Sequence, residues 1–119
     1  MLPGKESYRE IVVYGDDFWD FYYGQNVRVR EKILWTLRLV GDMPIVPKEY
    51  FTHLEGTDLY EVRVIFGGNI FRIFCFFDRG RLVVLLNAFQ KKSQKTPRKE
   101  IEKALKLKEK YYETKEQNS

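Results

Sequence analysis

The first part of the chain has the apolar spacing of two helices. Residues 9–14 (REIVVY) form a short β-rich run, and the following GDD provides a turn and a helix N-cap before FWDFYY. Gly24 is expected to end that helix. A second helix is predicted from Gln25 or Asn26 to Gly41, so that the two form a helical hairpin. Its apolar positions are Ile33, Leu34, Leu37 and Val40.

The middle of the chain changes to the spacing of strands. The stretch DMPIVPKEYFTHLEG holds two prolines and is expected to be mostly irregular, with Pro47 opening a single turn that buries Tyr50 and Phe51. Three runs follow, DLYEVRVIF, NIFRIFCFF and RLVVLLNAF, joined by the short turn signals GG(N) and DRG. These runs predict an antiparallel meander.

A final helix is predicted to open with Thr96 as its N-cap and Pro97 as its first residue. Residues 113–119 are expected to form a frayed tail. The apolar stripe of this helix comprises Ile101, Ala104, Leu105, Tyr111 and Tyr112.

Together these elements predict the α+β class: a small antiparallel sheet, made of the three-strand meander plus an N-terminal strand, with the helical hairpin on one face and a C-terminal helix. A chain of 119 residues has room for one core, so residues 1–119 are expected to form a single domain. The longest apolar runs are too short to cross a bilayer, and MLPGKESYRE lacks the apolar stretch of a secretory signal. A cytoplasmic protein without membrane contact is therefore expected.

Positive charge is concentrated toward the C-terminus. Residues from Arg79 to Lys110 include eleven Lys or Arg and three Asp or Glu, although the formal net charge of the whole chain is only +4. Such a segment attracts a polyanion such as nucleic acid, or an acidic protein, and it is also compatible with a plain solvated helix face. The one cysteine, Cys75, lies in FRIFCFF and is expected to be buried and inert.

The turn signals also predict which side chains meet across the meander. If Gly67 and Gly68 form a two-residue loop, Arg63 lies directly opposite Arg72, and such a like-charge pair costs up to about 1 kcal/mol. If the next loop is the two residues RG of DRG, Arg72 faces Asn87. A three-residue loop would break this arrangement.

The two faces of the predicted meander differ in polarity. The apolar face, expected to pack on the helical hairpin, comprises Val62, Val64, Phe71, Ile73, Cys75, Leu82, Val84 and Leu86. The arginine face has an apolar floor that the C-terminal helix is expected to cover, comprising Phe74, Phe76, Val83 and Leu85.

At the other end of that face, two exposed guanidinium groups beside Asn87 and Phe89 are predicted to form a phosphate pocket with an aromatic ring on which a base stacks. The alternative is an ordinary surface arginine at position 63, paired with Glu61, Asp58 or Asp78.

The run LYEVRVIFGGNIFRIFCFF, followed by GRLVVLLNAFQKKSQKTPRKEIEKA, resembles the RelE/ParE superfamily of bacterial toxins, in particular its phage-derived, HigB-like branch. The resemblance covers most of residues 8–112. It implies a toxin neutralised by a cognate antitoxin, commonly of the helix-turn-helix type, with operator DNA bound only through that antitoxin. It also implies cleavage of messenger RNA on the ribosome. Relatives in the ParE branch poison DNA gyrase instead, and an inactive remnant that binds only its antitoxin is a third alternative.

Metal-independent RNA cleavage uses the neighbouring 2′-hydroxyl as nucleophile, and it needs a base, cations for the charge on phosphorus and an acid for the leaving oxygen. We assign Arg63 and Arg72 to the scissile phosphate. Lys91 or Lys92 is assigned to proton transfer or charge stabilisation, because lysine crowded by cations has a lowered pKa. Each lysine is equally suited to holding RNA backbone alone. The residues expected to position RNA are Asn87, Phe89 as the stacking ring, Gln94, Lys95 and Arg98.

The general base stays open at this point. His53 is the only histidine, and Tyr111 and Tyr112 fall on the apolar stripe of the last helix. No His/Cys cluster or metal-ligand spacing is present in the sequence, so neither a metal nor another cofactor is expected. An acidic antitoxin segment is expected to cover the basic patch or to pack on the helical surface.

Overall fold

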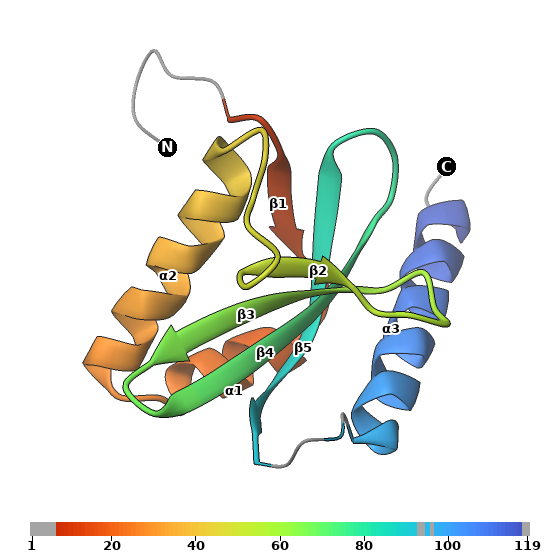
Figure 1. The fold of residues 1–119 in the computed structure, drawn as a ribbon. Coiled ribbons are helices and arrows are strands. Elements are labelled where there is room, and N and C mark those ends of the chain that lie inside the picture. Colours follow the sequence, from red (N-terminus) through yellow and green to blue (C-terminus); the bar gives the residue numbers. More distant parts are fainter. Residues whose placement is uncertain (1–6, 93–94, 96, 118–119) are drawn as a thin grey trace.

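The computed structural model describes residues 7–92, 95 and 97–117. The fold has three layers, with the helical hairpin on one face of a five-stranded sheet and the C-terminal helix on the other (Figure 1). The predicted α+β class is therefore confirmed. In chain order the elements are β1 (Glu10–Val13), α1 (Asp17–Tyr23), α2 (Val27–Asp42), β2 (Phe51–His53), β3 (Tyr60–Phe66), β4 (Asn69–Phe77), β5 (Leu82–Lys91) and α3 (Arg98–Gln117).

The helical hairpin is bounded largely as predicted. Gly24 ends α1, and Asn26 caps α2 by accepting a hydrogen bond on its side chain from a backbone N–H three residues later. The predicted stop at Gly41 is wrong, because α2 continues to Asp42. Gly41 contacts the residue before β1: its carbonyl accepts a 2.8 Å hydrogen bond from the N–H of Arg9.

The sheet has the strand order β1-β5-β4-β3-β2 and contains the predicted antiparallel meander of β3, β4 and β5. It differs from the prediction at both edges. β1 pairs in parallel with β5, and β2 adds a strand where irregular structure was predicted. The predicted turn at Pro47 is present, since its carbonyl accepts hydrogen bonds from the N–H groups of Tyr50 and Phe51. This turn delivers the chain to the edge of β3, where it pairs as β2.

The first hairpin of the meander has the predicted register. Phe66 pairs with Asn69 across the two-residue loop, and Arg63 lies directly opposite Arg72. The loop begins with Gly67 at a φ of +60°, a left-handed conformation that favours glycine.

The second hairpin does not have the predicted register. Its loop has three residues, because Phe77 pairs with Val83 and the N–H of Asp78 donates to the carbonyl of Leu82. A β-bulge then gives β5 one extra residue opposite Phe74. Arg72 consequently pairs with Phe89 and not with Asn87.

The three-residue loop and the bulge each shift the register of β5 by one residue. The first shift reverses the faces of the residues between the loop and the bulge, and the second restores the predicted faces after the bulge. Between the loop and the bulge, Val83 and Leu85 face the helical hairpin while Val84 and Leu86 face α3, the reverse of the prediction. Side chains alternate with a period of two, so the second one-residue shift restores the predicted face. Phe89 therefore lies on the α3 face, as predicted.

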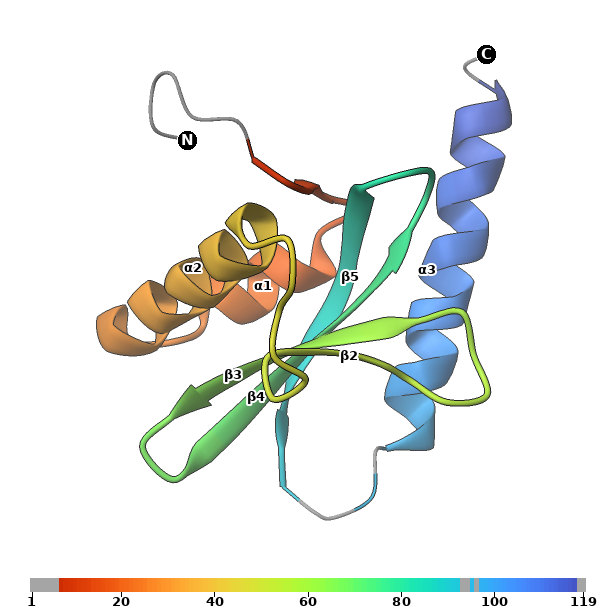
Figure 2. The same cartoon turned by 45° about the horizontal axis from the view of Figure 1, so that its top comes forward.

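α3 lies along one side of the molecule and packs on the sheet beside β4 and β5 (Figure 2). It begins at Arg98, one residue after the predicted first helical residue, and Thr96 lies outside the described residues. The predicted apolar stripe is correct except that Leu105 is exposed and Leu107 packs on the sheet.

The C-terminal part of α3 continues further than predicted. Residues 113–117 belong to the helix and do not form a frayed tail, while residues 118–119 lie outside the described part of the chain. Lys115 holds this last segment through a 2.6 Å ion pair with Asp78, in the loop between β4 and β5. No helix among the described residues is long and apolar enough to cross a membrane.

Candidate functional site

A cluster of charged side chains lies on the α3 face of the sheet, near the hairpin of β3 and β4. Glu61 and Arg63 are two residues apart on β3, so they point to the same face, and Arg72 lies opposite Arg63 on β4. Lys91 ends β5 on that face, where it pairs with Ile70. Arg63, Arg72, Lys91 and Glu61 together are called the charged cluster below.

Arg72 is not the exposed guanidinium that the sequence predicted. Arg72 is 7% exposed and Glu61 is 6% exposed, and Nη1 of Arg72 lies 3.3 Å from Oε2 of Glu61. Glu61 was considered only as a partner for Arg63, and its place in the site was missed. The spacing of Glu61 could have indicated this pair. Glu61 precedes Arg63 by two residues on the same strand, so it lies diagonally opposite Arg72.

Arg63 is more accessible than Arg72. The residue is half-buried, and within the described part of the chain its buried Nε makes no hydrogen bond and its guanidinium no ion pair. The carboxylates of Asp58 and Asp78, considered as its alternative partners, are instead paired with Lys108 and Lys115. Arg63 therefore offers an accessible, uncompensated cation beside a buried one.

Lys91 lies within electrostatic reach of both arginines. Burial lowers the pKa of Lys91 below its ordinary value, and the positive charges of Arg72 and Arg63 lower the pKa further, while Glu61 partly offsets this effect. This direction agrees with the prediction that a lysine crowded by cations has a lowered pKa, with burial as the larger cause. Lys92 follows the end of β5 and is exposed.

Asn87 and Phe89, predicted to contact RNA, are parts of the core. Asn87 is 1% exposed and Phe89 is 9% exposed. The side-chain amide of Asn87 donates hydrogen bonds of 3.1 Å to the backbone carbonyl and to Oε1 of Glu100, which ties β5 to α3. The Phe89 ring packs edge-on against Phe74, at 5.2 Å between ring centroids, so it does not offer a face for a base.

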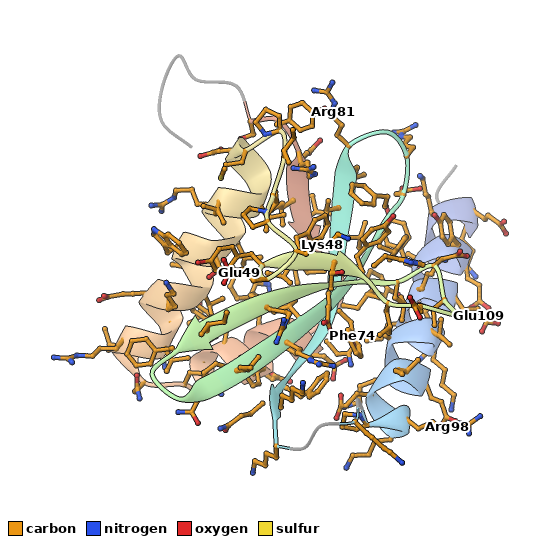
Figure 3. All side chains as sticks on the ribbon, viewed as in Figure 1. Lys48, Glu49, Phe74, Arg81, Arg98 and Glu109 are labelled. Atoms are coloured by element: carbon orange, nitrogen blue, oxygen red, sulfur yellow. The ribbon has the colours of Figure 1, made fainter. Side chains whose placement is uncertain are left out.

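The remaining predicted contacts lie in or after the exit segment of β5. Gln94 lies outside the described residues, and Lys95 is exposed. Arg98 pairs with Glu102, 3.5 Å away on α3, and points away from the sheet (Figure 3). Neither Arg98 nor Lys92 is buried with the charged cluster.

The side chains considered as general base are all placed elsewhere. His53 shares the face of Phe51 and Tyr60, opposite to the charged cluster, and its Nε2 bonds the carbonyl of Thr57 at 2.6 Å. The hydroxyls of Tyr111 and Tyr112 both donate to Asp78. Burial and the Asp78 carboxylate raise the pKa of Tyr111 to about 12, so its phenol stays protonated near neutrality.

Cys75 fits its predicted inert role. It is fully buried and its Sγ donates a 3.5 Å hydrogen bond to the carbonyl of Tyr60. Burial, together with the negative charge of Glu61, raises the pKa of the thiol, so the reactive thiolate is disfavoured.

The charged cluster is suited to an anion. The cluster contains three cations and one carboxylate, which leaves an excess of positive charge at a partly covered site. Two of the cations, Arg63 and Lys91, remain accessible to a ligand. In the part of the chain that the structure describes, no three His, Cys, Asp or Glu side chains are grouped as metal ligands.

Comparison of the sequence with known proteins identifies a family. No curated protein matches the chain. The family model described as Phage derived protein Gp49-like (DUF891) matches residues 21–109, which include every member of the charged cluster and well over half of the 119 residues. The chain therefore belongs to the phage-derived Gp49-like family.

Proposed function

We propose that the protein is the toxin of a type II toxin-antitoxin system and acts as a metal-independent, ribosome-associated endoribonuclease on messenger RNA. The observation that carries this proposal is the convergence of Arg63, Arg72 and Lys91 on one spot of the sheet. Membership of the Gp49-like family and the resemblance to HigB-like toxins support the same assignment.

In the absence of a ligand, the repulsion between these cations destabilises the fold. Like charges directly opposite each other in a sheet destabilise it by a few tenths of a kcal/mol up to about 1 kcal/mol, and Lys91 adds a third cation. A bound phosphate diester would remove this repulsion and satisfy the accessible guanidinium of Arg63. Perturbed titratable groups gathered around a partly open site are typical of functional sites.

Burial divides the roles within the charged cluster. Arg63 and Lys91 contact the scissile phosphate, because they are the accessible cations. Arg72 lies beneath them and contributes positive potential, while Glu61 fixes the position of its guanidinium. This role differs from the direct contact with the scissile phosphate that the sequence predicts for Arg72, because Arg72 is buried.

The proposed reaction proceeds by attack of the RNA 2′-hydroxyl on the adjacent phosphorus. The bond from phosphorus to the 5′-oxygen breaks and a 2′,3′-cyclic phosphate forms. Arg63 and Arg72 stabilise the negative charge on the non-bridging oxygens, and Lys91 donates its proton to the leaving 5′-oxygen. The proton of the 2′-hydroxyl passes to water. A lowered pKa makes the Lys91 ammonium a stronger acid for this step.

A second surface supports a protein partner, which we propose to be the antitoxin. Trp19 and Tyr23 are exposed on α1 with their rings stacked at 5.9 Å. Exposed Val27 begins α2, and the guanidinium of Arg30 lies 5.4 Å from the centre of the Tyr23 ring. Trp, Tyr and Arg are the residues that most often dominate binding energy at protein interfaces.

Induction of the protein in cells tests the proposed activity. New RNA 5′ ends are mapped in the same culture in which gyrase-linked DNA breaks are measured. We expect RNA ends at defined codon positions and no excess of DNA breaks. DNA breaks with intact messages would instead establish a gyrase poison.

A matched pair of arginine variants locates the site. Arg63→Ala is expected to abolish toxicity and RNA cleavage while leaving the fold intact, because the residue is only half-buried. Arg28→Ala, which removes an exposed arginine from α2, is the control and should remain toxic. Equal toxicity of the two variants would refute the assigned site.

A further inference from the structure

A ridge of lysines runs along one side of α3. Lys99, Lys103, Lys106 and Lys110 follow each other at intervals of four, three and four residues, and all four are exposed. These intervals place them on one side of the helix. At 1.5 Å per residue the ridge spans roughly 16 Å. These four residues are called the lysine ridge below.

The lysine ridge makes few contacts that stabilise the fold. Lys108 and Lys115, on other sides of α3, pair with Asp58 and Asp78 and so tie the helix to the sheet. Within the described residues, Lys103 has only a 4.0 Å pair with Glu100 on its own helix. The other three ridge lysines have no ion pair among those residues.

A surface hollow of about 380 Å³ adjoins the lysine ridge. All four ridge lysines line it, with Asp17 at the start of α1 on its far side. Leu107 is its one apolar lining residue, and Glu102 is the other acidic one. The hollow is thus lined mainly by lysine side chains, whose carbon stems form part of its wall and whose ammonium groups make it cationic.

We infer that the lysine ridge binds the phosphate backbone of helical RNA, an inference that rests on the proposed RNA-directed function. A row of lysine point charges suits regularly spaced phosphates, because such contacts need charge and position but no base recognition. Each strand of a DNA duplex carries one phosphate per about 3.4 Å of axis. The phosphates of an A-form RNA strand are also regularly spaced, so the ridge is long enough to meet several phosphates of one strand.

A protein partner fits the lysine ridge less well. Lysine is depleted at protein interfaces, whose centres are apolar or aromatic. Leu107 is the one apolar residue that lines the hollow, and no aromatic ring lines it, whereas the exposed aromatic rings lie on the helical hairpin. The ridge also faces α1, while Lys108 faces Asp58 in the loop between β2 and β3. It is therefore a surface for docking RNA and is separate from the charged cluster.

Binding to a duplex that cannot be cleaved tests this inference. The probe is a short RNA duplex with 2′-O-methyl riboses, which lack the attacking hydroxyl, titrated at several salt concentrations. The variant Lys99→Gln/Lys106→Gln/Lys110→Gln should bind at least tenfold more weakly at 0.1 M salt. The slope of log K against log salt should fall in magnitude by about 2 to 3, since each lost phosphate contact contributes about 0.9.

Two further variants control for net charge. Arg28→Gln/Arg38→Gln/Lys48→Gln removes three exposed cations from other elements and should bind the duplex within threefold of wild type. Asp17→Asn removes the anion across the hollow and should tighten binding two- to threefold.

The inference would be overturned if the two triple variants lost the same amount of affinity for the RNA duplex. It would also be overturned if the slope of log K against log salt were unchanged in the ridge variant. Tighter binding of the matching DNA duplex than of the RNA would overturn the assignment to RNA. Cleavage of a messenger on translating ribosomes is measured separately with the wild-type protein, so that absence of cleavage refutes the proposed nuclease and leaves the ridge result standing.

Discussion

The ion pair between Arg72 and Glu61 gives the sharpest test of the candidate site. Both side chains are more than nine-tenths buried and their charged atoms lie 3.3 Å apart. Removing one partner of a buried pair typically costs 3 to 5 kcal/mol, whereas replacing both by uncharged groups is often nearly neutral. We expect Glu61→Gln and Arg72→Met each to lower the free energy of unfolding by about 3 kcal/mol.

The double variant should then be more stable than the sum of the single effects implies. Independent losses would total about 6 kcal/mol, and we expect the double variant to lose only about 2 kcal/mol. For a chain of this size each kcal/mol shifts Tm by about 4 °C, so the single variants should melt about 12 °C below wild type.

Urea unfolding followed by circular dichroism at pH 7 measures these differences. The exposed pair of Arg98 and Glu102 serves as the control cycle, and its coupling energy should stay below about 0.5 kcal/mol. Additivity of Glu61→Gln and Arg72→Met within about 0.5 kcal/mol would refute the buried pair. The double variant should fold yet lack RNA cleavage, because it retains only two of the three cations.

Three other predictions concern single groups. Lys91→Arg keeps the positive charge but cannot readily release a proton, so RNA cleavage should fall at least a hundredfold while RNA binding stays within threefold of wild type. The wild-type cleavage rate should decline as pH rises through the lowered pKa of Lys91, and an increase across that range would contradict its role as acid. Burial alone would raise the pKa of Asp78, but hydrogen bonds from Lys115 and the two tyrosines lower the pKa below its ordinary value. The contribution of Asp78 to the stability of the fold is therefore complete above about pH 4 and is lost as pH falls through the folded-state pKa, so the melting temperatures of wild type and Asp78→Asn should converge in acid. Tyr23→Ala should weaken antitoxin binding at least tenfold in a calorimetric titration without changing RNA cleavage, and unchanged affinity would exclude the aromatic patch.

The first hairpin and the helical hairpin follow from local sequence signals. Two adjacent glycines fix the loop between β3 and β4, and the period of two then places Arg63 opposite Arg72. The Asn26 side chain caps α2, and Gly24, which lacks a side chain, ends α1. Local turn and cap residues determine these features because all the interacting groups lie within a few residues of each other.

The state of the charged cluster depends on contacts between distant residues. The amino-acid sequence is enough to predict that Arg63 and Arg72 meet on one face and that cations crowd Lys91. The burial of Arg72 against Glu61 and the hydrogen bonds from Asn87 to α3 depend on how the sheet and the helix pack. A β-bulge and a three-residue loop set the register of β5 through packing on both faces of the sheet, and no local pattern in the chain encodes that balance.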